Sequence, residues 1–355
     1  MTVPVKLAVA GVGNNISALA QGILHYADAV AGGADIDALP GVRRGFIGGL
    51  AVYDVQFVAA YDTDPGKIGT ELYDAMLRPP NNYPRLDVRL EPSGVTVEQG
   101  LTDSDEHAGP LSDQIVRLAE SLRAAGAEVL LYSLPTGLQW AATAYAEAAL
   151  AAGVAFVNCT PESVGRDEEL STRFIAAGVP LIGDDLASHL GTSIVHRSLL
   201  GLLAERGISL HSSYQLNLGG NQDFRNLRDR GASKRDSKLN ALAKAGVQLD
   251  RVDVIPSAGF VAHLEDHKVG YLNIEGVGWA GTPVEIDLKL KVQDSSNAAG
   301  VIIDLIRIAA AAVRVGEKGF VPAAVPLLKS PPKGHGAYTE VEVEASYDSL
   351  AARIA

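Results

Sequence analysis

Two patterns of hydrophobic and polar positions divide this chain of 355 residues. Up to about residue 190, short continuous apolar runs alternate with stretches in which apolar residues recur at helical spacing. This alternation predicts a parallel sheet with right-handed crossovers, that is, a doubly wound α/β domain. Beyond residue 190, several strand-like runs follow one another without helices between them. The second pattern predicts a separate α+β domain.

The expected elements of the first part alternate regularly. Strands are predicted over 5–10, 55–61, 128–135, 154–158 and 179–185, and helices over 17–24, 112–125 and 138–152. Residues from about 30 to 54 form an insertion between the first helix and the second strand. The acidic, turn-rich region 79–110 is predicted as a loop with one short strand.

The second part contains a strand of strict alternation. Apolar and polar residues alternate over 285–292, so one face of this strand is buried and the other is polar. Strands are predicted over 208–218, 252–255, 269–274 and 284–292, after a helix over 193–206. Together they predict a one-sided antiparallel sheet. A polar, charged stretch spans 221–244, and a long apolar helix is predicted over 297–315.

The first strand leads directly into a glycine-rich turn over residues 11–15. In this context backbone N–H groups and the positive end of a helix bind a diphosphate; Gly11 allows the tight turn and Gly13 the close approach of the phosphates. The second strand ends in Asp62, whose carboxylate is suited to accept hydrogen bonds from a ribose diol. Ile16 replaces the third glycine of the motif, so an ordinary glycine-rich strand–helix turn is the alternative.

Composition limits the class of protein. The chain is 47% hydrophobic and 20% charged, as in ordinary globular enzymes, and its formal net charge of −12 disfavours binding to nucleic acids or anionic membranes. Neither a signal peptide nor an uncharged apolar run of about 20 residues is visible, so a cytoplasmic location is expected. The single cysteine, Cys159, excludes an intramolecular disulfide, and a small buried strand residue is favoured over a nucleophile.

Polar residues follow two of the predicted strands. Asp184 and Asp185 lie at the carboxyl end of the strand 179–185, the edge at which open α/β sheets bind ligands. A helix N-cap with a spare surface acid is the alternative. The segment 217–223 offers carboxamides and N–H groups suited to orient sugar hydroxyls, with a plain turn as the alternative.

Four lysines stand in unusual settings. If 233–238 is helical, Lys234 and Lys238 lie on one face, where a bound phosphate would offset the repulsion between their ammonium groups. Lys268 enters a predicted strand, and Lys329 lies among leucines and prolines, where desolvation would lower its pKa and suit it to proton transfer. The alternative for Lys234 and Lys238 is a helix face exposed to solvent. The alternative for Lys329 is a side chain whose methylene groups are buried and whose ammonium group is in water.

The histidines give little support for a metal site. His263 and His267 stand four residues apart, a spacing that shares a metal on a helix, but they lie in a turn-like segment before a strand. The other histidines have no such partner. No Gly-x-Ser-x-Gly, P-loop or His-Glu-x-x-His motif occurs, so the sequence does not support a hydrolase or an ATPase.

Taken together, these segments resemble the inositol-1-phosphate synthase family, in particular its short bacterial and archaeal form. The resemblance covers nearly the whole chain. It lies in the ordered segments 11–15, 57–64, 183–186, 215–224, 233–238, 294–304 and 328–332. Ordered motifs over this length are far more specific than any one of them.

The resemblance implies a Rossmann-type domain that binds NAD over residues 1–187 and 298–355, and an inserted α+β domain for catalysis and tetramerisation over 188–297. It implies a redox-neutral isomerase that converts D-glucose 6-phosphate to 1L-myo-inositol 1-phosphate with tightly held NAD. C5 is oxidised, a C6 proton is removed, the enolate attacks the C1 aldehyde, and C5 is reduced again. The partners implied are a phosphorylated hexose and three further copies of the chain. Some bacterial members also use a divalent or monovalent cation, whose ligands the sequence does not identify.

The resemblance also implies roles for individual residues. Lys234 would exchange the C5 hydroxyl proton and Lys329 would stabilise the oxyanions, since fixed cations suit this task where water is excluded. The phosphate would be held by Lys238 and Lys268 with Ser188 and Asn221, and the sugar oriented by Asp185, Asp223 and Asn217. The residues expected at the cofactor are Gly11, Gly13, Asn14, Asn15, Asp62, Ser133, Asp184, Asp294 and Ser295.

The chain departs from the family pattern at three places. Ala187 stands where the family commonly carries lysine, and the segments 132–137 and 229–249 are altered. The sugar pocket is therefore expected to have one cation fewer. The sequence thus constrains the type of reaction more than the identity of the substrate. A different sugar phosphate, such as fructose 6-phosphate, would give a five-membered carbocycle. An ordinary NAD-dependent dehydrogenase and a non-catalytic NAD-binding protein also stay open at this point.

Overall fold

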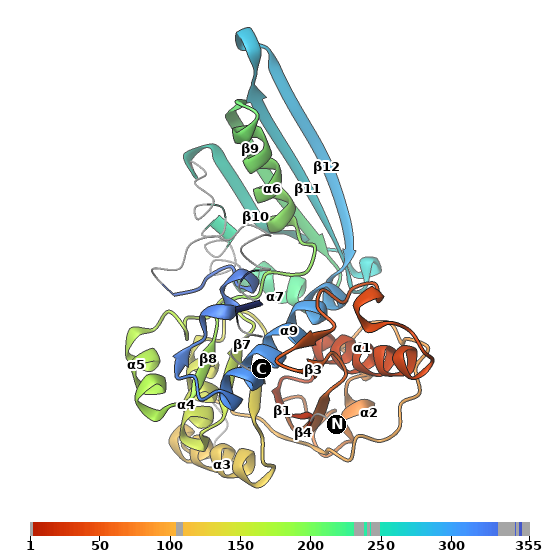
Figure 1. Ribbon diagram of the computed structural model, residues 1–355, viewed down its shortest axis with the longest axis vertical. Coiled ribbons are helices and arrows are strands. Elements are labelled where there is room, and N and C mark those ends of the chain that lie inside the picture. Colours follow the sequence, from red (N-terminus) through yellow and green to blue (C-terminus); the bar gives the residue numbers. More distant parts are fainter. Residues whose placement is uncertain are drawn as a thin grey trace.

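The chain forms two main sheets, one below the other in Figure 1. The structure is a computed structural model that describes residues 3–103, 109–230, 238, 239, 242, 249–332, 345, 348 and 349. A seven-stranded sheet with its helices makes up the lower part of the molecule, and a four-stranded sheet projects above it together with one helix. A short hairpin accompanies the larger sheet.

The larger sheet is built as the alternating pattern predicts, and every pairing in it is parallel. Its strands are β1 (Val5–Ala10), β4 (Val55–Asp62), β5 (Val97–Gln99), β6 (Val129–Tyr132), β7 (Ala155–Asn158), β8 (Pro180–Ile182) and β13 (Gly319–Phe320). The spatial order is β13-β8-β7-β6-β1-β4-β5, so the direction of winding reverses between β1 and β6. The prediction of a Rossmann-type doubly wound sheet is confirmed, and a ligand is expected at the carboxyl ends of these two strands.

Helices cover both faces of this sheet. One core contains α1 (Asn14–Ala31) and α9 (Asp294–Arg314), and the other contains α3 (Leu111–Ala124), α4 (Gln139–Ala152) and α5 (Glu168–Ala177). The sequence pattern did not predict α5, and the four-residue α2 (Leu72–Ala75) lies beside β4. By length and composition α9 is the one described helix that could cross a membrane, but 78% of its apolar window is buried inside the protein, as in a core helix.

The predicted insertion is a hairpin fastened to α9. It contains β2 (Phe46–Ile47) and β3 (Leu50–Ala51). Arg307 of α9 is fully buried; it donates hydrogen bonds to the carbonyl oxygens of Gly45 and Leu50 and pairs with Asp304 at 2.5 Å. A buried guanidinium thus satisfies the backbone of a segment that lies far away in the sequence.

The smaller sheet has the spatial order β10-β9-β11-β12. Its strands are β9 (Ser209–Gly219), β10 (Val252–Phe260), β11 (His267–Val277) and β12 (Pro283–Gln293), and α6 (Thr192–Glu205) packs on one face. The antiparallel prediction is confirmed for β9 with β11 and for β11 with β12, and it is wrong for β10, which runs parallel to β9. The long connection that includes α7 (Gln222–Arg230) carries the chain back to the starting end of β9, so it acts as a crossover and not as a hairpin.

The long C-terminal helix begins earlier than the sequence predicts. Apolar spacing indicated a start at residue 297, whereas α9 begins at Asp294. This places Asp294 and Ser295 in the first turn of α9, next to the end of β12. The domain boundaries 1–187, 188–297 and 298–355 stay a proposal.

Candidate functional site

A cavity of about 460 Å³ is lined by residues from both sheets and from the loops that follow β1, β4, β6 and β8. Most of the predicted site residues line it: Gly11, Gly13, Asn14, Asn15, Asp62, Ser133, Asp185, Ser188, Asn221, Asp223, Lys238, Lys268, Asp294, Ser295 and Lys329. Asp184 and Asn217 are not among its lining residues, and Lys234 lies outside the described residues. The cavity therefore lies at the reversal point of the larger sheet, where ligands of such sheets bind.

The glycine-rich turn has the geometry of a phosphate-binding loop. Gly11 has a φ of +90°, and a Cβ there would lie 2.8 Å from the carbonyl oxygen of Ser133, so a side chain does not fit. At Gly13 the space around a Cβ is open, on the side of the cavity. No side chain caps the start of α1, which leaves its first N–H groups for an anionic group of a ligand.

Lys329 is held beside Asp185. Its Nζ donates to Asp185 Oδ1 at 3.0 Å, and the two side chains are 11% and 1% exposed. The chain segments that carry them run together: the Lys329 N–H donates to the Asp185 carbonyl at 2.7 Å, and Leu186 bridges to Leu328. Asp185 has a φ of 55°, a left-handed conformation that is unusual for a residue with a side chain. The structure thus joins two predicted site residues that lie far apart in the sequence.

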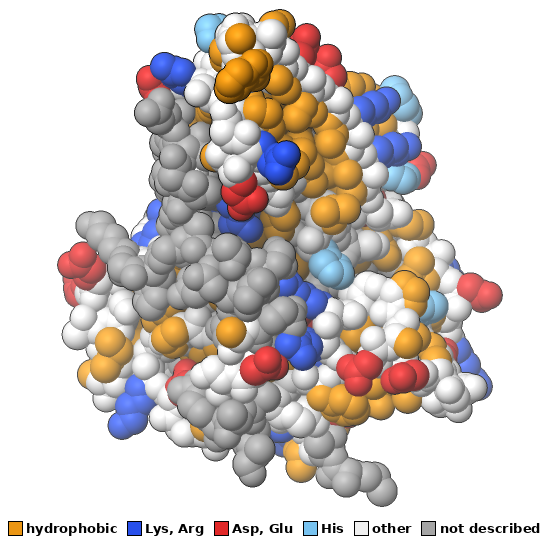
Figure 2. Space-filling model, turned by 45° about the horizontal axis from the view of Figure 1, so that its top comes forward, with side chains coloured by type: hydrophobic (Ala, Val, Ile, Leu, Met, Phe, Trp, Pro, Cys, Tyr) orange, Lys and Arg blue, Asp and Glu red, His pale blue; other side chains and the backbone are white. Residues whose placement is uncertain are grey.

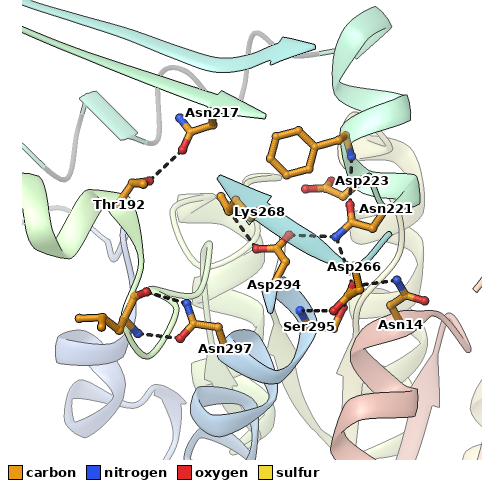
Figure 3. Close-up of polar contacts among 12 residues, drawn as sticks. Asn14, Thr192, Asn217, Asn221, Asp223, Asp266, Lys268, Asp294, Ser295 and Asn297 are labelled. Atoms are coloured by element: carbon orange, nitrogen blue, oxygen red, sulfur yellow. Dashed lines mark hydrogen bonds and ion pairs between the residues drawn. The ribbon is translucent and has the colours of Figure 1, made fainter. Parts of the chain in front are cut away.

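Lys268 is held beside Asp294 (Figure 3). Its Nζ lies 3.2 Å from Asp294 Oδ1, and the other carboxylate oxygen accepts a hydrogen bond from Asn221 Nδ2 at 3.0 Å. The ammonium also lies 5.5 Å from the centre of the Phe224 ring. One carboxylate in the first turn of α9 therefore orients both a lysine and an amide at the cavity.

Asp266, which the sequence reasoning missed, ties this region to the glycine-rich turn (Figure 3). It is fully buried and accepts from Ser295 Oγ at 2.6 Å and from Asn14 Nδ2 at 2.9 Å. Burial raises the pKa of Asp266, the Asp294 charge adds to this, and the donors from Ser295 and Asn14 oppose it. In the sequence, Asp266 is an ordinary acid in a polar turn, and only its burial reveals its role.

The third lysine at the cavity is Lys238, which is 3% exposed. Because residues 231–237 lie outside the described part of the chain, the predicted pairing of Lys234 with Lys238 on one helix face is not tested. Asp223 accepts a hydrogen bond from Thr136 Oγ1 at 3.3 Å, which brings the start of α7 next to the loop after β6.

Known proteins match this chain along most of its length. A sequence model of the family described as myo-inositol-1-phosphate synthase matches residues 191–295. An inositol-3-phosphate synthase from Mycobacterium tuberculosis (strain CDC 1551 / Oshkosh) is 39% identical over 345 residues, which span 93% of this chain and 91% of that protein. The chain belongs to the myo-inositol-1-phosphate synthase family. The resemblance inferred from the sequence motifs is confirmed, and with it the expectation of an enzyme from a family of NAD-dependent isomerases.

Solved structures share the fold of this chain. The crystal structure of a protein named Ari2 is 64% identical, covers 99% of both chains and superimposes with a TM-score of 0.88. A myo-inositol-1-phosphate synthase-related protein from Thermotoga maritima is 21% identical over 98% of both chains, with a TM-score of 0.79, and shows that the fold is shared.

Two residues that the synthase resemblance placed at the ligands instead hold the protein together. Asp184 is fully buried and accepts from Gly165 N at 2.9 Å, Asn158 Nδ2 at 2.8 Å and Arg166 Nε at 3.1 Å. It therefore fixes the loop after β7, and we assign it a structural role. Asn217 is also fully buried, with its amide between Thr192 and the carbonyl oxygen of Ile255, and it does not line the cavity.

The adenosine end of the expected cofactor site contains a buried lysine that the sequence did not indicate. Lys67 donates to the Val12 carbonyl at 2.8 Å and lies 3.9 Å from Asp62 Oδ2. Burial lowers the pKa of Lys67, and the charges of Asp62 and Asp64 oppose this. Asp62 accepts from the N–H groups of Val12 at 2.7 Å and Asp64 at 2.9 Å, and a carboxylate has further lone pairs for a ribose diol. The turn is thereby locked in place around the predicted ribose site.

The histidine pair does not form the helical metal site considered from its spacing. His263 lies in a single 3₁₀ turn over Ala262–Leu264, and His267 lies in β11 with its Nδ1 3.1 Å from the Leu264 carbonyl. Within the described part of this synthase-family chain, no group of three or more His, Cys, Asp or Glu residues is placed to hold a metal ion. Cys159 is buried, and burial raises the pKa of its thiol, in agreement with a packing residue.

Proposed function

We propose that this chain catalyses the NAD-dependent, redox-neutral cyclisation of D-glucose 6-phosphate to 1L-myo-inositol 1-phosphate. The observation that carries the proposal is that Lys238, Lys268 and Lys329 line one cavity together with the glycine-rich turn. Several fixed cations suit a reaction in which a phosphate must be held while oxyanions form and disappear. An ordinary dehydrogenase does not need this arrangement, and a non-catalytic NAD-binding protein has no use for it.

The residues around the cavity suit NAD. The turn with Gly11 and Gly13 and the uncapped start of α1 would hold the diphosphate, Asn15 and Ser133 are hydrogen-bonded to each other at 3.1 Å beside it, and Asp62 would hold the ribose. NAD, when bound, supplies reversible acceptance of a hydride from the sugar C5. Asp294 and Ser295, in the first turn of α9, would lie near the nicotinamide.

The lysines would then act on the sugar. A ketone at C5 acidifies the C6 protons, and the ammonium of Lys329, fixed by Asp185 at 3.0 Å, stabilises the enolate and the aldol oxyanion. A base takes the proton of the broken C6–H bond, and the electron pair of that bond forms the C6–C1 bond. The C1 aldehyde oxygen takes up one proton in return, so no proton is gained or lost overall. We assign the proton exchange at the C5 hydroxyl to Lys234, which lies outside the described residues.

The remaining residues would bind the substrate. Lys268 and Lys238 hold the phosphate, with help from Ser188 and Asn221. Asp223 and Asp185 accept hydrogen bonds from the sugar hydroxyls, and both carboxylates line the cavity. The negative charges of these acids thus offset part of the positive charge of the lysines, and the same acids orient the sugar.

Ala187 favours a second candidate substrate. Ala187 lines the cavity, and the family commonly carries a lysine at this position, so a sugar bound there would meet one cation fewer. Fructose 6-phosphate would undergo the same oxidation at C5 and proton loss at C6. Its enolate would attack the C2 ketone in place of a C1 aldehyde, and the product would be a five-membered ring that bears a hydroxymethyl group.

One experiment separates these functions. The enzyme and NAD are incubated with glucose 6-phosphate and, separately, with fructose 6-phosphate, and the dephosphorylated products are identified by carbon NMR. Six ring carbons that each carry a hydroxyl would establish the inositol product, and a hydroxymethyl cyclopentane signal would establish the second candidate. Net accumulation of NADH absorbance would contradict both and indicate an ordinary dehydrogenase.

We also propose a homotetramer that forms through the projecting sheet. Ser213, Gln215 and Asn217 of β9 face α6, so residues between them, such as Tyr214, point to the opposite face. Tyr214, Ile255 and Tyr271 are about two-fifths exposed, at 42%, 44% and 39%. Figure 2 shows hydrophobic side chains gathered over this projecting part of the molecule.

A cytoplasmic location and a need for a divalent or monovalent cation also stay proposals. Activity after treatment with EDTA tests whether a divalent cation is needed.

A further inference from the structure

A chain of buried polar side chains lies behind the cavity, between α6 and β9 (Figure 3 shows its Thr192–Asn217 link). Thr192 and His196 come from α6, and Ser213, Gln215 and Asn217 from β9; each is more than nine-tenths buried. Thr192 lines the cavity. The helix approaches the sheet closely because residue 270 is glycine, where a Cβ would lie 2.0 Å from Thr192 Cγ2. Five polar groups are therefore packed where apolar ones are usual, and each needs a partner.

The hydrogen bonds of Ser213 determine the tautomer of His196. Ser213 Oγ lies 2.9 Å from the carbonyl oxygen of Asn273, which can only accept, so the single hydroxyl hydrogen is directed there. His196 Nε2 lies 2.5 Å from the same Oγ and must therefore donate to it. The hydrogen of the neutral ring is on Nε2, and Nδ1 is an acceptor.

The same reasoning determines the orientation of Gln215. Asn217 Nδ2 donates to the carbonyl of Ile255 at 3.1 Å, so Asn217 Oδ1 accepts from Thr192 Oγ1 at 2.9 Å. Thr192 Oγ1 in turn accepts from Gln215 Nε2 at 2.9 Å. The remaining atom of this amide, Gln215 Oε1, is an acceptor.

Two acceptors are thus left in the protein interior. Within the described residues, His196 Nδ1 and Gln215 Oε1 have no hydrogen-bond donor. Lys238 is a donor in this neighbourhood: it is 3% exposed, lines the cavity and carries up to three N–H groups. Leu239, the next residue after Lys238, packs against the apolar cluster that contains Leu200 and Leu203 of α6, which brings this segment beside the helix that carries His196. In agreement with this, burial lowers the pKa of His196 to about 4, Gln215 opposes this shift, and the positive charge of Lys238 adds to it.

We propose that His196 and Gln215 are positioning residues that hold the ammonium group of Lys238 from behind. His196 Nδ1 and Gln215 Oε1 accept two of its N–H groups, and the third N–H is directed at the phosphate of the substrate. The neutral ring is essential to this arrangement, because an imidazolium has no acceptor and repels an ammonium. The proposal rests on the proposed function in that Lys238 contacts a phosphate.

Two substitutions at one position test the geometry. Asparagine in His196→Asn places an oxygen near the position of Nδ1, whereas glutamine in His196→Gln reaches the position of Nε2 and leaves the Nδ1 position empty. With the NAD-loaded enzyme, His196→Gln should raise KM for the sugar phosphate about tenfold with little change in kcat, and His196→Asn should restore KM to near its original value. In a Lys238→Met background, His196→Gln should have no further effect. Equal KM values for both variants, or an added effect without Lys238, would overturn the proposal.

Binding of inorganic phosphate to the NAD-loaded enzyme, measured by calorimetry, separates this inference from the proposed function. Weaker binding in both Lys238→Met and His196→Gln supports both. If only Lys238→Met binds phosphate more weakly, the role of His196 is contradicted. If neither variant binds phosphate more weakly, the proposed contact between Lys238 and the phosphate is itself contradicted. A ¹⁵N spectrum of the histidines gives an independent readout: a hydrogen on Nδ1 of His196 would contradict the proposal, and thermal melting verifies that each variant is folded.

Discussion

The surroundings of Lys329 and Asp185 determine the chemical properties of this pair of residues. The ammonium and the carboxylate lie 3.0 Å apart and are almost entirely shielded from water. A charge in such a place interacts more strongly with a developing oxyanion than it would in water. The hydrogen bond between the main chains of the same two residues fixes the segment that carries the lysine.

Replacing this lysine tests its role. Lys329→Ala should reduce turnover by roughly a hundredfold to a thousandfold, since one fixed donor at an oxyanion contributes that much. NAD binding, followed by calorimetry, should persist, because Lys329 is not part of the glycine-rich turn. Lys318→Ala, an exposed lysine outside the cavity, is the matched control and should have no effect. Loss of NAD binding together with turnover would mean that Lys329 has a structural role.

His196 predicts a dependence of stability on pH. Burial lowers its pKa from 6.5 to about 4, so between these values the unfolded chain binds a proton that the folded chain does not. Stability from this group is complete above pH 6.5 and is lost as the pH falls to 4, by roughly 3 kcal/mol in the free energy of unfolding. Urea denaturation of the wild type and His196→Asn at pH 7 and pH 4 measures it. The wild type should lose more stability than the variant; identical losses would show that the histidine does not contribute.

Neighbouring residues also show where sequence reasoning succeeded and where it failed at this scale. Asp184 and Asp185 were both expected at the ligands, yet successive side chains at the end of a strand point in different directions, and only Asp185 reaches the cavity. Lys67, Asp266 and Gln215 are ordinary polar residues in the sequence. Their roles arise from burial against distant segments, which no local pattern records.

Among the elements, α9 contacts both the cavity and the segments packed around it. Its first turn presents Asp294 to Lys268, and its middle carries the buried pair Asp304–Arg307 that fastens the β2–β3 hairpin. These two side chains are 3% and 0% exposed. A buried charge without its partner strongly destabilises a protein, even where the intact pair contributes little.

Removal of that guanidinium should therefore be costly. Arg307→Leu removes the guanidinium that pairs with the buried Asp304 carboxylate and should lower the free energy of unfolding by about 3–5 kcal/mol, measured by urea denaturation. The double variant Arg307→Leu/Asp304→Leu should regain part of this loss, because the buried carboxylate is then removed as well. Arg314→Leu, at the exposed end of the same helix, is the control and should change stability little. A single variant as stable as this control would contradict the assignment.

The elements that were predicted correctly are those whose pattern depends on local burial. Strands of a parallel sheet are covered on both faces and therefore appear as continuous apolar runs, which is why β1, β4, β6 and β7 were visible in the sequence. The direction of β10 was not visible in the sequence, because it depends on how a long connection returns to the sheet. The helix α5 was missed between two strands that were both identified.

At the scale of the whole molecule, the cavity belongs to neither sheet alone. Lys268 comes from the smaller sheet, Asn14 from the start of α1, which packs on the larger sheet, and Lys329 from the segment that follows β13. In Figure 1 these parts meet where α9 passes below the projecting sheet. Substrate and cofactor would therefore be held by different parts of the molecule that are fixed to each other through Asn14 and Asp266.

The exposed face of the projecting sheet predicts an oligomer. Tyr271→Glu places a negative charge beside Leu216 and Ile255, in the row that ends at Lys289, and should convert a homotetramer into smaller species, measured by light scattering. Val116→Glu, at an exposed position of α3 on the other part of the molecule, is the control and should leave the mass unchanged. A tetramer that survives Tyr271→Glu would mean that the copies meet elsewhere.

The pairing of the segment around Leu186 with the segment around Leu328 has a consequence for synthesis of the protein. A nascent chain that has emerged from the ribosome as far as residue 320 already contains every strand of both sheets, yet it lacks Lys329. Such a chain has the glycine-rich turn that we assign to the cofactor but not the lysine that we assign to the oxyanions. On the proposed function, we therefore expect catalytic competence only after the last segment of the chain has been synthesised and has paired with the segment around Leu186.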